Sequence, residues 1–101
     1  MPTPFPLPFE ELERLCEEYG TPLQIYDETH IRNNAKTLLT EMKKKFPSFR
    51  QFYAVKALPN PTILQILSDE GCGMDCSSVA ELWICKQLGI KGDNIMYTST
   101  F

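Results

Sequence analysis

The chain has 101 residues, enough for one small domain and too few for two. Its apolar fraction of 43% and charged fraction of 23% are ordinary for a globular protein, and its net charge of -3 argues against a nucleic-acid partner. No apolar stretch is long enough to cross a bilayer, and the proline-rich start does not resemble a signal peptide, so we expect a cytoplasmic protein, or an organellar one if an upstream leader has been lost.

Two helices and a short strand are predicted in the first half of the chain. Apolar residues at helical spacing predict a helix over Phe9–Tyr19, which Gly20 can end because glycine tolerates a left-handed backbone. Alternating side chains after a proline predict a strand over Leu23–Tyr26. Asp27 can cap a second helix that runs to Lys45, where three lysines complement the helix dipole.

Strands and helices alternate in the second half. The predicted elements are a strand at Gln51–Ala57, a helix from Asn60 to Gly71, a strand at Met74–Cys76, a helix from Ser78 to Gly89 and a strand at Ile95–Thr98. Such alternation, in repeats of roughly twenty residues, is typical of parallel βα units. The sequence therefore predicts an α/β fold in which three parallel strands and two helices leave one sheet edge and one face uncovered.

Lys56 is the first candidate for chemistry. Side chains alternate across a strand, so we expect Phe52, Ala54 and Lys56 to share one face, with Lys56 at the carboxyl end. In a βα barrel that end is the mouth of the active site. The lysine can simply reach into solvent, which the residues alone favour, or it can be an amine that condenses with an aldehyde.

Two carboxylates are the next candidates. Asp75 lies in the following strand and comes near Lys56 if the two strands are neighbours. It is either a ladder-end aspartate, which the sequence alone slightly favours, or a carboxylate that positions the lysine or a cofactor. Glu81 has capping-box spacing from Ser78, and from that helix start it could also hydrogen-bond Lys56.

The four cysteines do not favour a metal site or a disulfide framework. Cys72 and Cys76 are four residues apart, but the only histidine, His30, is far away in the sequence and is expected to be structural or exposed. Nothing indicates a secreted protein. We predict buried or half-buried thiols for these two residues and for Cys16 and Cys85.

Three motifs stand in order along most of residues 19–100. They are Tyr19–Asp27 (YGTPLQIYD), Phe52–Ala57 (FYAVKA) followed by Asn60-Pro61, and Gly71–Ser78 (GCGMDCSS) with Glu81-Leu82. In this order and spacing they resemble the fold-type III pyridoxal-phosphate-dependent decarboxylases, and diaminopimelate decarboxylases above all. The Asp-Cys-x-Ser form of the third motif is also close to ornithine decarboxylases.

The resemblance implies the N-terminal portion of a (β/α)8 barrel of the alanine racemase/ornithine decarboxylase type, joined to a β-domain in a protein that is usually a homodimer with shared active sites. Lys56 would bond pyridoxal 5'-phosphate covalently. Asp75 and Glu81 match acidic positions near the lysine and the cofactor, and Ala54 matches a small residue that lines the surroundings of the cofactor ring.

The same resemblance divides the chain into two parts. Residues 1–27 would form an arm, a helix and a strand associated with the β-domain, and residues 28–101 would form the first βα units of the barrel. The resemblance also implies parts that this sequence lacks, such as a glycine-rich phosphate loop and a ring-stacking histidine. We therefore expect a fragment that is catalytically inactive alone, with Phe101 as an arbitrary stop.

The implied activity is decarboxylation of a small amino acid, most of all meso-diaminopimelate to lysine in lysine biosynthesis. Gly20-Thr21-Pro22 and Asn60-Pro61 favour this over an ornithine or arginine decarboxylase. Alanine racemase is disfavoured because Lys56 is not followed by an Asn-Ala-Tyr-Gly run. A non-catalytic decarboxylase-like regulatory protein that binds an intact partner, and a small α/β domain with an incidental lysine, are the remaining alternatives.

Overall fold

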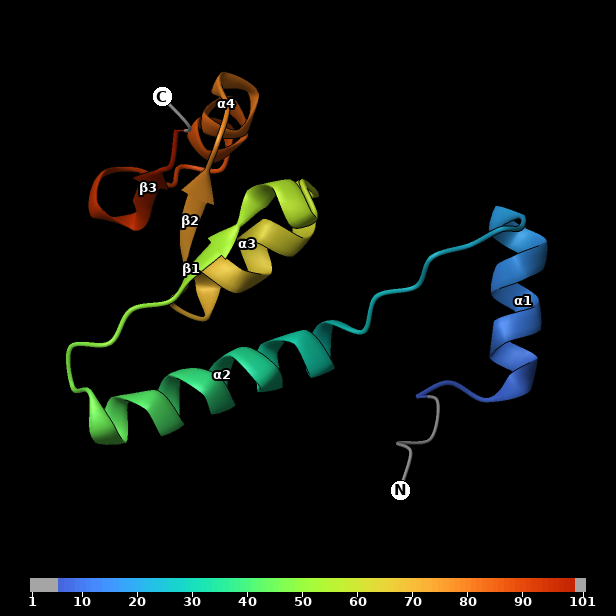
Figure 1. Ribbon diagram of the computed structural model, residues 1–101. Helices are drawn as coiled ribbons and strands as arrows, with labels where there is room; N and C mark the ends of the chain where they lie inside the picture. The colour runs from blue at the N-terminus through green and yellow to red at the C-terminus, as the bar shows by residue number, and fades with distance from the viewer. Residues whose placement is uncertain (1–5, 100–101) are drawn as a thin grey trace.

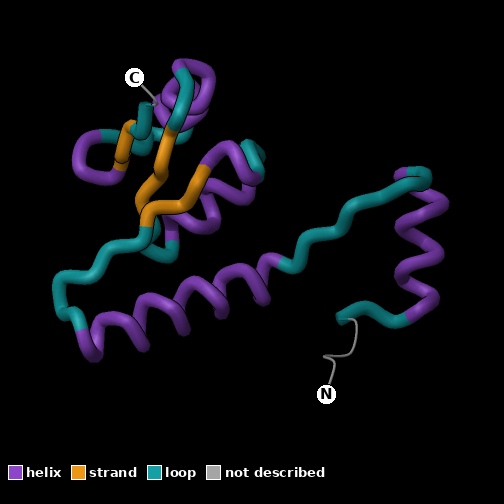
Figure 2. Tube along the Cα trace, viewed as in Figure 1, coloured by secondary structure: helices purple, strands orange, loops and turns teal. Residues whose placement is uncertain are grey.

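The computed structural model describes residues 6–99. The elements in chain order are α1 (Phe9–Tyr19), α2 (Glu28–Lys45), β1 (Phe52–Ala54), α3 (Pro61–Asp69), β2 (Gly73–Cys76), α4 (Val79–Gln87) and β3 (Ile95–Tyr97), with 3-10 turns at Val55–Ala57 and Gly92–Asn94. In Figure 1, α1 stands apart from a body formed by the sheet and the other three helices, and Figure 2 shows the long loop that connects them. The predicted α/β class is confirmed.

The three strands form one parallel sheet in chain order, β1-β2-β3. Asp75 in the middle strand is in register with Ala54 on one side and Met96 on the other. Because the strands are parallel, their carboxyl ends all meet at the same edge of the sheet. In an α/β protein this edge is where ligands bind.

The two faces of the sheet differ in burial. Met74 and Cys76 of β2 are completely buried, and the Sγ of Cys76 lies 3.6 Å from the Sγ of Cys85 on α4, so their face is the one that the helices cover. Ala54 and Asp75 are half-buried and Met96 is 49% exposed. The face that carries these three side chains is therefore the open one.

At the amino ends of β1 and β2, the open face is tightly packed around Gly73. A Cβ atom at this position would lie 2.7 Å from two ring carbons of Phe52, its register partner on β1, and 3.0 Å from the carbonyl oxygen of Asn94. No real side chain tolerates such contacts, so only glycine allows β1 and β2 to pair here.

The helix starts follow the predicted caps. The Asp27 carboxylate accepts a hydrogen bond from the backbone N–H of His30 at 3.1 Å, and α2 then begins at Glu28. Asn60 Oδ1 accepts from the N–H groups of Thr62 at 3.0 Å and of Ile63 at 3.3 Å, at the start of α3. These caps satisfy backbone donors that a helix leaves unpaired in its first turn.

Helix α2 is held against α3 by charge as well as by packing. Arg32 donates to Glu70 at 2.8 Å and lies 3.5 Å from Asp69, both at the end of α3. Ala35 and Leu39 are buried on the same side of α2, next to the main core. The side of α2 that carries these two residues therefore faces the body of the molecule.

Two strand predictions were wrong. The segment at 23–26 is a loop rather than a strand, since nothing in the described residues 6–99 pairs with it. The first strand of the sheet ends at Ala54, because Val55 turns fully into the core and Val55–Ala57 forms a 3-10 turn. Among the same residues, no helix is both long and apolar enough to cross a membrane.

Candidate functional site

Lys56 stands at the carboxyl edge of the sheet, two residues after the last residue of β1. It is exposed, and within residues 6–99 its amine takes part in no hydrogen bond or ion pair. The expectation that Lys56 shares a strand face with Phe52 and Ala54 was wrong, because the extended backbone ends before it. Its position at the edge places a free primary amine where ligands of parallel sheets bind.

Asp75 reaches the same edge from the neighbouring strand. It is the register partner of Ala54, so the structure brings these two predicted site residues side by side. Asp75 Oδ1 accepts a hydrogen bond of 2.6 Å from the hydroxyl of Thr98, the residue that follows β3. This bond links the carboxyl ends of β2 and β3.

Glu81 has a different environment. It is only 9% exposed, and its carboxylate turns back onto the loop before α4. Oε2 accepts from the Ser78 hydroxyl at 2.6 Å, Oε1 accepts from the Ser77 N–H at 3.1 Å, and the Glu81 N–H donates to Ser78 Oγ at 3.3 Å. The predicted cap is confirmed, although the backbone N–H that the carboxylate binds belongs to Ser77, the residue before the cap, and not to Ser78.

The cysteines are packing residues in this structure. Cys72, Cys76 and Cys85 are buried, Cys16 is half-buried, and all four are free thiols, as predicted. Burial, reinforced by the neighbouring Cys85 thiol, raises the pKa of Cys76 to about 12, and burial also raises the pKa of Cys72. Within residues 6–99, no group of His, Cys, Asp and Glu is arranged to hold a metal ion.

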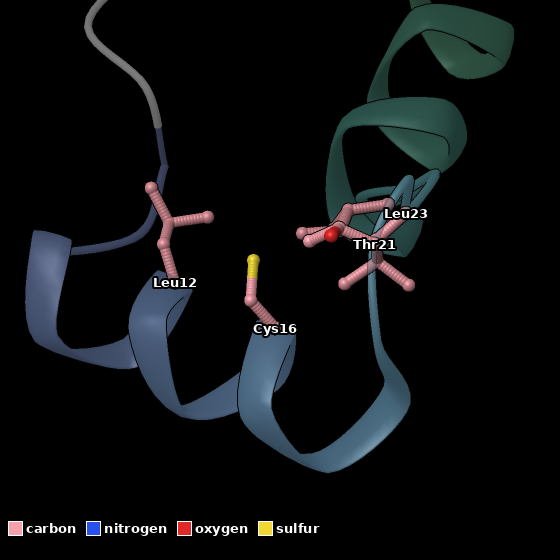
Figure 3. Close-up of a pocket in the computed structure, with 5 residues that line it drawn as sticks. Leu12, Cys16, Thr21 and Leu23 are labelled. Atoms are coloured by element: carbon pink, nitrogen blue, oxygen red, sulfur yellow. The ribbon is translucent and has the colours of Figure 1, made fainter.

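A cavity of about 450 Å³ lies elsewhere in the molecule. Figure 3 shows Leu12 and Cys16 of α1 on one side of it, with Thr21 and Leu23 of the following loop on the other. Ile25 completes its lining, which contains no charged side chain. This cavity carries no group suited to the chemistry of Lys56, and α1 is remote from the sheet.

Comparison with known proteins identifies the sheet-forming part of the chain. Residues 32–101 match the family described as "Pyridoxal-dependent decarboxylase, pyridoxal binding domain". The chain belongs to this family. The match includes Lys56, Asp75 and Glu81, and the family resemblance noted in the sequence is thereby confirmed.

Pyridoxal-dependent decarboxylases also appear among the individual relatives. The chain is 44% identical to Protein TabA of Pseudomonas amygdali pv. tabaci, over 90% of this chain and 21% of the relative. It is 39% identical to the diaminopimelate decarboxylase of Methanothermobacter thermautotrophicus, over 83% of this chain and 20% of the relative. The chain thus spans about a fifth of the length of these relatives.

A solved structure shows the same arrangement of elements. The lysine/ornithine decarboxylase of Vibrio vulnificus, crystallised with putrescine, superposes with a TM-score of 0.78 at 27% identity. The superposition covers 91% of this chain and 24% of that enzyme. The N-terminal portion of the decarboxylase barrel is therefore the fold of this chain, as the sequence predicted.

The side chains at the carboxyl edge of the sheet fit a pyridoxal cofactor. A cofactor aldehyde bonds to a primary amine, and Lys56 offers one that is exposed and without a partner in the described part of the chain. The carboxylate of Asp75 lies at the same edge, held by a hydroxyl rather than by a competing cation. Glu81 is occupied by its own loop and reaches the site only through Ser77 and Ser78.

Sequence reasoning missed Thr98. It was assigned to the last strand without a role, although alternation from Met96 places it on the same face as Asp75. The register between β2 and β3 was the missing information, since only that register puts the hydroxyl within reach of the carboxylate.

Proposed function

We propose that this chain provides the cofactor lysine of a pyridoxal-phosphate-dependent amino-acid decarboxylase, and that Lys56 is this lysine. The proposal rests on one observation above all: an exposed amine without a partner in residues 6–99, at the carboxyl edge of a parallel sheet, inside the segment that matches the family. Pyridoxal phosphate, when bound, supplies the electron sink that decarboxylation of an amino acid requires.

The neighbouring residues have separate roles in this proposal. Asp75 presents a fixed negative charge to the lysine and the cofactor at the edge. Ala54, in register with it, leaves room for a flat ring because it has no bulky side chain. Glu81 fixes the loop at Ser77 and so keeps the carboxyl end of β2 in place.

For the substrate we propose meso-diaminopimelate, converted to lysine. The 39% identity with a diaminopimelate decarboxylase over most of this chain supports it. A diamino acid such as lysine or ornithine is the second candidate, favoured by the similarity to the Vibrio vulnificus enzyme. Release of CO2 from each of the three amino acids, measured on a polypeptide that carries this segment with a complete barrel and β-domain, decides between them.

The domain division and assembly remain part of the proposal. Residues 28–101 would start the barrel, and residues 1–27 would associate with a β-domain in a cytoplasmic homodimer. The position of α1 supports the division, because this helix buries none of its residues against the rest of the chain and stands apart in Figure 1.

Chemical labelling of the chain tests the role of Lys56. The chain is mixed with pyridoxal phosphate, reduced with borohydride and digested, and the adducts are mapped by mass spectrometry. We expect most of the adduct on Lys56, its loss in Lys56→Ala, and no change in Lys86→Ala, which removes an exposed lysine of α4. Adduct spread evenly over all lysines would contradict the proposal. The isolated chain is expected to release no CO2.

A further inference from the structure

We propose that Thr98 is a positioning residue of the cofactor site, whose hydroxyl holds the carboxylate of Asp75 in place at the sheet edge that also carries Lys56. This inference rests on the proposed function and adds to it a residue on the third strand. The Thr98 hydroxyl joins the residue that follows β3 to Asp75 of the middle strand β2.

The backbone and the side chain of Thr98 both restrict the position of its hydroxyl. The backbone N–H of Thr98 donates to the carbonyl oxygen of Cys76 at 2.8 Å, which extends the ladder between β2 and β3 by one residue. A threonine side chain is branched at Cβ and therefore restricted in χ1. Backbone and side chain together bring the Oγ1 of Thr98 to 2.6 Å from Asp75 Oδ1.

Asp75 depends on this contact because little else restrains it. Its side chain lies on the open face, beside Ala54 and Met96, and no positively charged group pairs with it in residues 6–99. Loss of the hydroxyl would leave the carboxylate free to change rotamer while the sheet stays intact. A site that needs a fixed charge next to its lysine would then lose its preference for that lysine.

The test compares Thr98→Val, which keeps the shape and removes the hydroxyl, with Thr98→Ser, which keeps the hydroxyl. Thr40→Val, at an exposed position of α2, is the matched control. Two quantities are measured in the whole chain: the three-bond NMR couplings that report the χ1 rotamer of Asp75, and the share of borohydride-reduced pyridoxal phosphate on Lys56. Thr98→Ala replaces Thr98→Val if the valine variant does not fold.

We expect one Asp75 rotamer in the wild type, Thr98→Ser and Thr40→Val, and averaged couplings in Thr98→Val. The Lys56 share of the adduct should fall at least threefold in Thr98→Val and recover in Thr98→Ser. An unchanged rotamer or an unchanged Lys56 share in Thr98→Val would overturn the inference. Even labelling of the wild type, with Asp75 couplings that still depend on the hydroxyl, would overturn the proposed function and support the positioning of Asp75.

Discussion

At the level of single residues, Val55 sets the direction of Lys56. Its side chain is completely buried in the core, and the backbone leaves the extended conformation there to form a 3-10 turn. Lys56 consequently emerges at the edge of the sheet and is exposed, instead of lying flat on one face. One buried valine thus explains why the amine is accessible.

The buried thiols allow a prediction about reactivity. The thiolate is the reactive form, and burial that raises the pKa of Cys76 from 9.0 to about 12 lowers the thiolate fraction at pH 8 by roughly a thousandfold. We expect iodoacetamide at pH 8 to modify the half-buried Cys16 first and to leave Cys76 and Cys85 unmodified in the folded chain. Peptide mass spectrometry over time measures the order.

The control for this experiment is the same reaction in concentrated urea. Unfolding removes the burial, so all four cysteines should then react at similar rates. Rapid modification of Cys76 without denaturant would show that the packing of α4 on β2 opens readily.

Part of the candidate site could be proposed from the sequence alone. Lys56, Asp75 and Glu81 lie in motifs that are contiguous in the chain, so these residues could be named as candidates from the order of the motifs. Thr98 was missed because its role depends on which strands are neighbours and in what register, and no local pattern states that. The turn at Val55 was missed because it follows from burial against helices that come later in the chain.

At the level of elements, helices were easier to predict than strands. The starts of α2, α3 and α4 are determined by Asp27, Asn60 and Ser78, whose bonds reach only two or three residues along the chain. A strand needs a partner from elsewhere. The segment at 23–26 has the composition of a strand but finds no partner within residues 6–99, so it stays a loop.

Glu81 provides a prediction for the start of α4. Glu81→Ala removes the acceptors of the Ser77 N–H and the Ser78 hydroxyl, so the free energy of unfolding should fall by about 1–2 kcal/mol. Glu81→Gln keeps an acceptor oxygen and should lose less than half of that. Urea unfolding followed by circular dichroism measures both values.

Equal stability of the wild type and Glu81→Ala would contradict this account of the cap. Equal losses in Glu81→Ala and Glu81→Gln would mean that the negative charge, rather than the hydrogen bonds, stabilises the helix start. That charge effect is expected to be smaller than the effect of the bonds.

At the level of the whole molecule, the chain is more extended than a compact domain. Its radius of gyration is 16.4 Å, whereas a compact chain of about 100 residues has roughly 13 Å. Figure 1 shows the reason, since α1 and its connecting loop stand away from the body that contains the sheet. The core lies entirely between α2 and β3.

Removal of the first 26 residues should therefore leave the body intact. Helix α1 buries none of its residues, so we expect the free energy of unfolding to change by less than about 0.5 kcal/mol. The shortened chain has to begin at Asp27, because its carboxylate caps α2. Urea unfolding of the full chain and of the shortened chain, which carries one added methionine before Asp27, measures the difference.

The full chain with Asp27→Ala serves as the comparison. It keeps α1 and loses the cap, and it should be destabilised by about 1 kcal/mol. A larger loss from the deletion than from this substitution would show that α1 does pack on the body in solution.

The order of the strands has a consequence for how the chain folds during its synthesis. Each strand pairs with the strand that precedes it in the sequence, and each crossover is a single helix. The register partners of both strand pairs are therefore 21 residues apart, a separation spanned by one helix and its loops. As the polypeptide leaves the ribosome from its amino end, β1 and α3 are already available when β2 emerges, and β2 is available when β3 emerges. The sheet can thus grow in step with translation, one βα unit at a time.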